Sequence, residues 1–129
     1  MLNKIMLIGN LGRDPEMSYT PSGSAITKFT VAVNRRSKDR QTGENRDETT
    51  WFNIVAWERL AEICNQYLHK GSKVYLEGRM TSHKYTDKDG VERTGWEVTL
   101  NDMKMLDTKD SRGGAGSGAD DMSADDIPF

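Results

Sequence analysis

The chain has 129 residues, of which 35% are hydrophobic and 29% are charged, and its formal net charge is −2. This length allows one domain with a flexible end rather than two domains with separate cores. No apolar stretch approaches the roughly 18 residues of a membrane span, and the N-terminus lacks the basic, apolar and small-residue order of a signal peptide. The single cysteine, Cys64, excludes an internal disulfide and a cysteine-based zinc site. We therefore expect a cytoplasmic protein with no membrane association.

The charge is distributed unevenly along the chain. Residues 1–107 contain sixteen Lys and Arg against fifteen Asp and Glu, whereas residues 108–129 contain two against five. A near-neutral body is thus joined to an acidic end, which the whole-chain value hides. A net charge of only +1 for this body is far from that of the strongly basic domain expected to bind a nucleic acid through phosphate contacts alone. Such binding would need local basic patches and aromatic stacking.

The first half of the chain has strand patterns. An apolar run over 2–8 predicts a strand that is buried on both faces. A second strand, at 25–36, alternates apolar and polar residues, and a third, at 51–57, is aromatic and β-branched. The segment 37–49 between them has almost no apolar residue, so we expect it to be a mobile loop.

The second half begins with a change of period. Apolar residues over 58–70 follow one helical face, and Gly71 is placed as a C-terminal cap. Two further strands, at 72–85 and 95–106, flank a hairpin tip. A helix between the third and fourth of five strands is the layout of the oligonucleotide-binding barrel. The predicted fold is therefore an all-β, five-stranded barrel with one helix.

The chain is expected to have three parts. The barrel domain occupies 1–107, a flexible Gly/Ser-rich linker occupies 108–118, and an acidic tip occupies 119–129, so that the C-terminal tail is disordered. Acidic residues followed by apolar residues and a terminal carboxylate form a peptide ligand for a partner with an apolar pocket and a basic rim. A solubilising tail alone would explain the aspartates but not the apolar end. The residues of this predicted docking tip are Asp125, Asp126, Ile127, Pro128 and Phe129.

Two tryptophans mark one face of the third strand. Trp51 and Trp57 are six residues apart, so both point away from the core side that carries Phe52, Ile54 and Ala56. Aromatic side chains outside the core suggest a platform on which unpaired bases stack. The alternative, left open by the strand alone, is that these rings fill the barrel or a subunit interface.

Basic side chains accompany the aromatics in both long connections. Arg35 and Arg36 precede the polar segment, which itself carries Arg40, and Lys84 precedes Tyr85 at the second hairpin. Cations beside an exposed aromatic are typical of a surface that follows the phosphates of a single strand and stacks its bases. Acidic residues in the same segments leave open the simpler interpretation of a solvated loop.

The sequence contains no catalytic constellation. His69 and His83 are the only histidines and have no metal-type spacing. Cys64 lies on the apolar helix face, which indicates an inert thiol. We expect a protein that is not an enzyme and that needs no cofactor and no metal.

Short segments throughout the chain share a specific pattern. They are Ile8 to Glu16, Thr42 to Glu44, Thr50 to Phe52, Leu60 to Glu62, Tyr67 to Ser72, Val74 to Arg79, and the final Asp-Asp-Ile-Pro-Phe. Together they resemble the bacterial single-stranded DNA-binding proteins. The resemblance implies an oligonucleotide-binding barrel, assembled as a homotetramer, that binds single-stranded DNA without sequence preference in replication, recombination and repair. It also implies that the tip docks replication, recombination and repair proteins, and that the protein is associated with the nucleoid.

The resemblance carries over to individual positions. It implies stacking contacts at Trp51, Trp57 and Tyr85, while a further stacking tryptophan of many members aligns with Ser37. Trp96 matches no such position and, by alternation with its neighbours, is expected in the core. The basic contacts expected from residues and resemblance together are Lys4, Arg35, Arg36, Arg40, Arg59, Lys70 and Lys84.

Two functions from different classes fit the sequence. The leading hypothesis is sequence-independent binding and protection of single-stranded DNA, with recruitment of partners through the acidic tip. The alternative is a barrel that acts as a protein-interaction adaptor of the replication-restart type, with DNA contact incidental. A row of solvent-facing aromatics argues against the adaptor, which has no need of them.

Overall fold

The computed structural model of this chain describes residues 1–107. The predicted linker and tip lie outside the described residues. The elements follow one another in this order: β1 (Ile5–Leu11), β2 (Glu16–Tyr19), β3 (Ala25–Lys38), β4 (Asn45–Trp57), α1 (Glu58–Tyr67), β5 (Lys73–Thr86) and β6 (Glu92–Met105). No helix in this part of the chain is long and apolar enough to span a membrane.

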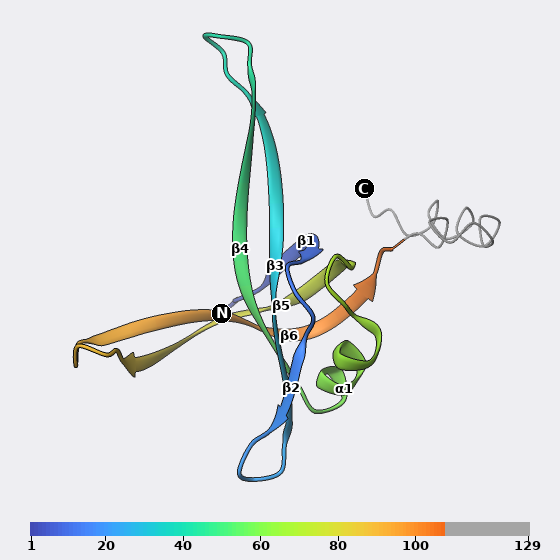
Figure 1. Cartoon of the computed structure of the whole chain (residues 1–129), viewed down its shortest axis with the longest axis vertical. Coiled ribbons are helices and arrows are strands. Elements are labelled where there is room, and N and C mark those ends of the chain that lie inside the picture. Colours follow the sequence, from blue (N-terminus) through green and yellow to red (C-terminus); the bar gives the residue numbers. More distant parts are fainter. Residues whose placement is uncertain (108–129) are drawn as a thin grey trace, which may run out of the picture.

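Five of the strands close into a barrel. Their order is β1-β5-β6-β4-β3, and β1 pairs back onto β3 at Asn10 and Leu11. All neighbouring strands are antiparallel except β4 and β6, which run parallel. The short strand β2 lies along β3 outside this ring. The fold is the predicted oligonucleotide-binding barrel, with β2 as an addition and α1 between the third and fourth barrel strands (Figure 1).

The core lies inside the barrel and beneath α1. The helix contributes Ala61 and Cys64, and Leu68 packs directly after it. The buried Thr27 hydroxyl on β3 donates a hydrogen bond of 2.7 Å to the carbonyl of Ala61, which fixes α1 to the sheet. Burial raises the pKa of the Cys64 thiol to about 12, so the thiol stays protonated and inert, as predicted. The inward-facing strand residues include Leu7, Leu11, Phe29, Val31, Ile54, Ala56, Val74, Leu76, Val98 and Leu100.

Two glycines allow neighbouring strands to approach closely enough to close the barrel. A Cβ at Gly9 would overlap the carbonyl of Ala32, and one at Gly78 would overlap the carbonyl of Thr99. Gly78 also belongs to a register shift with Glu77 in the pairing of β5 with β6. Bulges of this kind increase the local bend of a strand, which a small barrel requires.

The segment 37–49, predicted to be a loop, is mostly strand. The β3–β4 pairing continues outward to Lys38 opposite Asn45, and the Asp39 amide donates to the Glu44 carbonyl at 2.8 Å to close the turn. Figure 1 shows this hairpin rising far beyond the barrel. A scarcity of apolar residues excludes burial, but it does not exclude a hydrogen-bonded two-stranded arm. Absence of burial and absence of strand pairing are therefore separate properties of this segment.

Two smaller predictions are wrong. The first strand is not buried on both faces, because Met6 and Ile8 are exposed while Leu7 is buried. The helix ends at Tyr67 rather than at the residue before Gly71. Gly71 instead has a left-handed φ of 92° in the turn that leads to β5, a conformation that favours glycine.

Candidate nucleic-acid interface

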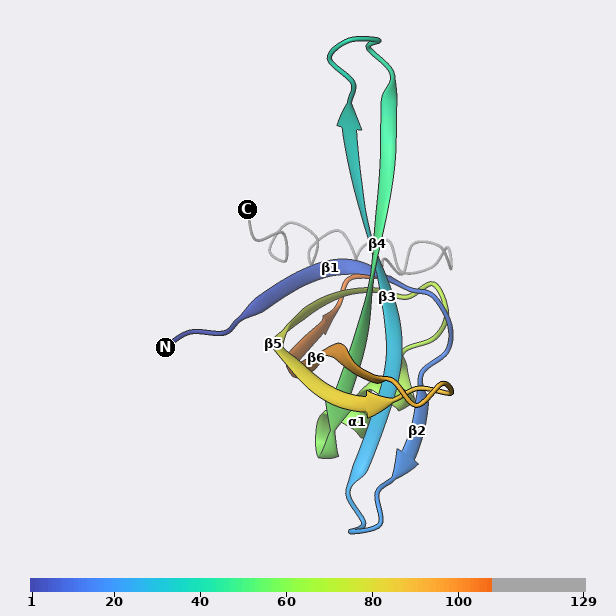
Figure 2. The ribbon, with the colours of Figure 1, turned by 90° about the vertical axis from the view of Figure 1, so that its left-hand side faces the viewer.

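The site lies where the two long hairpins separate. The parallel strands β4 and β6 pair only at Ile54 with Val98 and at Val55 with Thr99. Beyond this contact the β3–β4 arm and the β5–β6 arm leave the barrel in different directions, as the two views show (Figures 1 and 2). A cleft of about 400 Å³ lies at the separation.

Both arms contribute to the walls of this cleft. The lining includes the buried residues Phe29, Ile54 and Val55. Arg13, in the connection between β1 and β2, and Glu16, the first residue of β2, line it as well. The β3–β4 side supplies Lys28, Thr30, Asn53 and Val55, and the β5–β6 side supplies His83, Tyr85, Gly95, Trp96 and Glu97.

The three predicted stacking aromatics are all exposed. Trp51 is 59% exposed, Trp57 41% and Tyr85 46%. Trp51 and Trp57 stand on the outer side of β4 at either end of the cleft-lining pair Asn53 and Val55, whereas Tyr85 lines the cleft itself. Their exposure rules out the alternative that these rings fill the barrel. It leaves both a DNA-binding and a subunit-contact role possible.

Local backbone geometry presents the two tryptophans. The Trp51 ring lies against Gly12, where a Cβ would come within 2.5 Å of the ring atom Cζ3. Trp57 ends β4 and is the N-cap of α1, and Glu58 directly after it has a left-handed φ of 54°. The Ala25 amide donates to the Glu58 carboxylate at 3.1 Å, which supports this strained turn. The chain thus changes direction immediately after Trp57 and leaves its ring at the surface.

The predicted basic residues are exposed but are spread over several elements. Arg35, Arg36 and Arg40 belong to the β3–β4 arm, and the Nε of Arg36 donates to Asp47 at 3.2 Å. Lys84 is on the β5–β6 arm, with its Nζ 3.7 Å from Glu92.

Two further cations lie beside α1. Arg59 is in its first turn, directly after the Trp57 junction. Lys70 follows the helix, and its backbone amide donates at 2.7 Å to Asp14, two residues beyond the Gly12 that contacts Trp51. Arg59 is therefore near Trp57 and Lys70 is near the Gly12 that contacts Trp51, and neither residue lines the cleft.

Lys4 is not brought to the cleft. Its Nζ lies 3.5 Å from the carboxylate of Glu77 on β5, which also accepts a 2.7 Å hydrogen bond from the Tyr75 hydroxyl. The hydrogen bond from Tyr75, with a smaller contribution from Lys4, lowers the pKa of Glu77, and the same bond raises the pKa of Tyr75. Lys4 thus belongs to the outer side of β1 and β5.

Two cations that sequence reasoning did not place in the site line the cleft. Lys28 is the register partner of Val55, which lies between Trp51 and Trp57 on β4, and Arg13 lies in the connection from β1 to β2. Among residues 1–107 neither forms an ion pair. The sequence could have indicated Lys28, because the alternation of the second predicted strand puts this residue on the polar face.

Trp96 is the main correction within the site. It is 59% exposed rather than part of the core, although Val98 and Leu100 in the same row are buried. Alternation identified the correct face of β6, but at Trp96 the strand has already left the barrel. No signal in the sequence marks that exit point.

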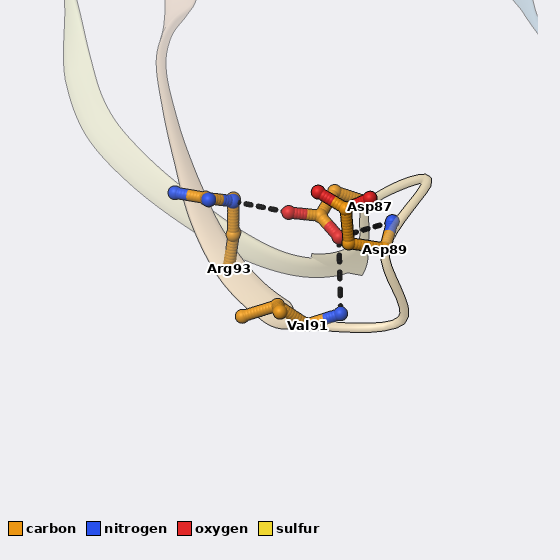
Figure 3. Close-up of polar contacts among 4 residues, drawn as sticks. All are labelled: Asp87, Asp89, Val91 and Arg93. Carbon is orange, nitrogen blue, oxygen red and sulfur yellow. Dashed lines mark hydrogen bonds and ion pairs between the residues drawn. The ribbon is translucent and has the colours of Figure 1, made fainter.

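The tip of the β5–β6 arm is held by one carboxylate (Figure 3). Asp87 accepts hydrogen bonds from the backbone amides of Asp89 at 2.9 Å and Val91 at 3.0 Å, and it pairs with the Nε of Arg93. The Arg93 contact, followed by the amide of Val91, lowers the pKa of Asp87. Because Arg93 pairs in register with Tyr85, this network orders the part of the arm that carries the third aromatic.

Comparison with known proteins decides the family. Residues 2–106 match the Single-strand binding protein family. The chain belongs to this family. Membership makes it a binding protein rather than an enzyme, and in residues 1–107 no group of three or more His, Cys, Asp or Glu side chains is arranged to hold a metal ion.

Individual relatives agree with this family assignment. The single-stranded DNA-binding protein of Neisseria meningitidis serogroup A is 50% identical over 113 residues, which are 88% of this chain and 64% of that protein. The protein of the same name from Wolinella succinogenes is 44% identical over 128 residues, 99% of this chain and 78% of the relative. A Plasmodium falciparum SSB, solved in complex with ssDNA, is 31% identical with a TM-score of 0.77 over 83% of this chain and 97% of that one. This chain thus spans less than two thirds of the Neisseria relative's length.

The Asp87 network predicts an acid-sensitive arm in this family member. The pKa of Asp87 is lowered in the folded arm. The ionised carboxylate therefore stabilises the arm fully above the ordinary carboxyl pKa of about 4, and this stabilisation is lost as pH falls through the lowered pKa. We expect the amide signals of Asp89 and Val91 to shift together below about pH 4 in an NMR titration. Asp87→Asn should remove that step, whereas Asp89→Asn should keep it. Retention of the step in Asp87→Asn would show that another group causes it.

Proposed function

We propose that the chain binds single-stranded DNA without sequence preference and protects it during replication, recombination and repair. The observation that carries the proposal is the cleft between the arms, which Tyr85 lines, with the exposed Trp51 and Trp57 on β4 at either end of the lining residues Asn53 and Val55. Exposed aromatic rings around a groove accept bases of any identity, because every base has a stacking face. The names of the relatives, single-stranded DNA-binding proteins, support the same substrate.

Stacking supplies much of the binding energy in this proposal. The body has a net charge of only +1, so counterion release from phosphate contacts alone gives limited affinity. Each base on an aromatic ring adds about 1–3 kcal/mol. Arg35, Arg36 and Arg40 on one arm and Lys84 on the other then follow the backbone of the strand on either side of the stacked bases.

The proposal predicts different effects for aromatic and basic substitutions. In a titration with long oligo-dT, Trp51→Ala and Trp57→Ala should each weaken binding by about 1–3 kcal/mol with little change in salt dependence. Lys84→Ala should reduce the slope of log K against log salt by about 0.7 to 1. The measurement is the quenching of tryptophan fluorescence by oligo-dT, compared between the unmodified chain and each variant at two salt concentrations.

Matched controls come from exposed residues away from the cleft. Tyr67→Ala removes an exposed aromatic from α1, and Lys104→Ala removes a cation from the outer side of β6; neither should change affinity or slope. If the intact chain shows no quenching at either salt, the tryptophans are not part of a DNA site. The interaction-adaptor hypothesis would then replace this one.

We also propose that the chain assembles as a homotetramer. Strand β1 pairs with β3 only at Asn10 and Leu11, so its first half has an edge that no strand among residues 1–107 covers. Met6 and Ile8 are exposed on this half, beside the partly buried Tyr75. An uncovered strand edge with apolar side chains is a ready template for pairing with a second copy.

Charged substitutions on β1 test the assembly. Met6→Lys combined with Ile8→Lys should lower the mass measured by light scattering from four chains to two or one, because buried lysines destabilise an apolar contact. Val91→Lys, at an exposed apolar position on the β5–β6 arm, should leave the mass unchanged. A mass of four chains in the β1 variant would place the interface elsewhere, and a single-chain mass for the unmodified protein would exclude the tetramer.

We propose, finally, that the tip Asp125–Phe129 recruits replication, recombination and repair proteins, in a cytoplasmic protein associated with the nucleoid. The tip lies outside the described residues, so the proposal rests on its sequence of acidic residues, two apolar residues and an aromatic end.

Removal of the terminal aromatic tests this recruitment. Deleting Phe129 should leave oligo-dT affinity within about twofold and should abolish capture of replication and repair proteins from a bacterial lysate by the immobilised chain, since the apolar anchor is lost. Asp120→Asn combined with Asp121→Asn changes the tail charge but keeps the terminal residues, and should retain most of the capture. Capture of the same proteins without Phe129 would assign recruitment to the barrel.

A further inference from the structure

Trp96 is an exposed aromatic residue that belongs neither to the core nor to the predicted stacking residues Trp51, Trp57 and Tyr85. Its exposed fraction, 59%, equals that of Trp51. Its row on β6 continues inward to Val98 and Leu100, which are buried. At Trp96 the row passes beyond the barrel, and among the described residues nothing packs over the ring sufficiently to bury it. An indole left this open is available to a ligand.

The neighbours of Trp96 on the arm are polar and basic. Its register partner on β5 is Ser82, and Lys84, the partner of Thr94, lies diagonally on the same face. His83 and Tyr85 stand on the opposite face of the arm, above Gly95, with their ring centroids 5.9 Å apart. Aromatic rings therefore flank this arm on both faces, and residues from both faces line the cleft.

The charge of the cleft suits a base better than a phosphate. The cations Arg13 and Lys28 line it together with the carboxylates Glu16 and Glu97, and Glu97 lies 3.4 Å from the Nδ1 of His83. Opposite charges in equal number give little net attraction for a phosphate. The volume of about 400 Å³ is that of a small-molecule site, and polar groups in such a site hydrogen-bond the edges of a planar ligand.

We propose that this cleft is an additional subsite that holds one unpaired base of the bound strand, with Trp96 as its stacking surface. This inference rests on the proposed binding of single-stranded DNA and adds a contact to it. The base enters between the arms, stacks on the indole and directs its polar edge toward Asn53 and Thr30, which line the facing wall. The phosphates on either side of the base remain outside the cleft, near Lys84 of the β5–β6 arm.

Substitution of Trp96 combined with an abasic strand tests the contact. Trp96→Ala should weaken binding of oligo-dT by at least about fivefold, the lower limit for loss of one stacked base, with no change in salt slope. Trp96→Phe retains a stacking face and should stay within about twofold. On an abasic strand of the same length, which offers phosphates without bases, Trp96→Ala and the unmodified protein should bind equally. Val91→Ala, an exposed apolar residue on the same arm outside the cleft, is the matched control.

A second readout follows the indole itself. In Trp51→Phe combined with Trp57→Phe, Trp96 is the only tryptophan, since the chain has three. Saturating oligo-dT should then quench its fluorescence and protect it from acrylamide, while the abasic strand should do neither. This readout remains decisive if Trp96→Ala does not fold.

The outcomes separate this inference from the proposed function. If the unmodified protein binds oligo-dT with quenching but Trp96→Ala binds equally well, the subsite is wrong and the proposed function stands. Loss of assembly in Trp96→Ala, seen as a reduced mass without DNA, would assign Trp96 to a subunit contact and would also overturn the subsite. If the unmodified protein itself neither binds nor is quenched, the proposed function fails first.

Discussion

The short parallel contact between β4 and β6 is the constraint on which the site depends. The two strands pair at only two positions, Ile54 with Val98 and Val55 with Thr99. A longer pairing would join the two hairpins into one continuous sheet and would close the space between them. Because the pairing stops there, each hairpin follows its own twist and leaves the barrel as a separate arm. The cleft, its aromatic walls and the exposure of Trp96 are consequences of that early separation.

The barrel frees its outer surface for binding because α1 completes the core from one end. Ala61, Cys64 and Leu68 are buried at or near the helix, and the bond from Thr27 to Ala61 holds it in place. The strands therefore need to bury only their inward rows. The Trp57 ring stays at the surface because the chain turns into the helix immediately after this residue. On β4, the exposed Trp51 and Trp57 thus alternate with the buried inward residues Ile54 and Ala56.

Sequence patterns predicted the faces of the strands but not where those strands leave the barrel. Alternation with a period of two correctly separated Trp51 and Trp57 from the buried Ile54. The same rule put Trp96 in the core, because it has no information on whether a partner layer still covers that position. It also gave no reason to extend the paired strands into 37–49, where backbone hydrogen bonds rather than apolar burial hold the arm. The cleft itself combines residues far apart in the chain, so no local pattern could define it.

The paired arms also determine how much entropy binding must remove. The β3–β4 arm is hydrogen-bonded out to Lys38 and Asn45, and the β5–β6 arm is closed by the Asp87 network. Their backbones are already hydrogen-bonded in the structure, so the proposed binding of single-stranded DNA should restrict mainly side chains, such as those of Arg35 and Lys84. A disordered basic loop with the same residues would lose backbone freedom as well, at about 1–2 kcal/mol for each residue fixed. For a body with a net charge of +1, preorganised arms reduce the affinity that phosphate contacts must provide. In the proposed binding, this is the physical reason why a strand pairing that buries almost nothing would still contribute to affinity.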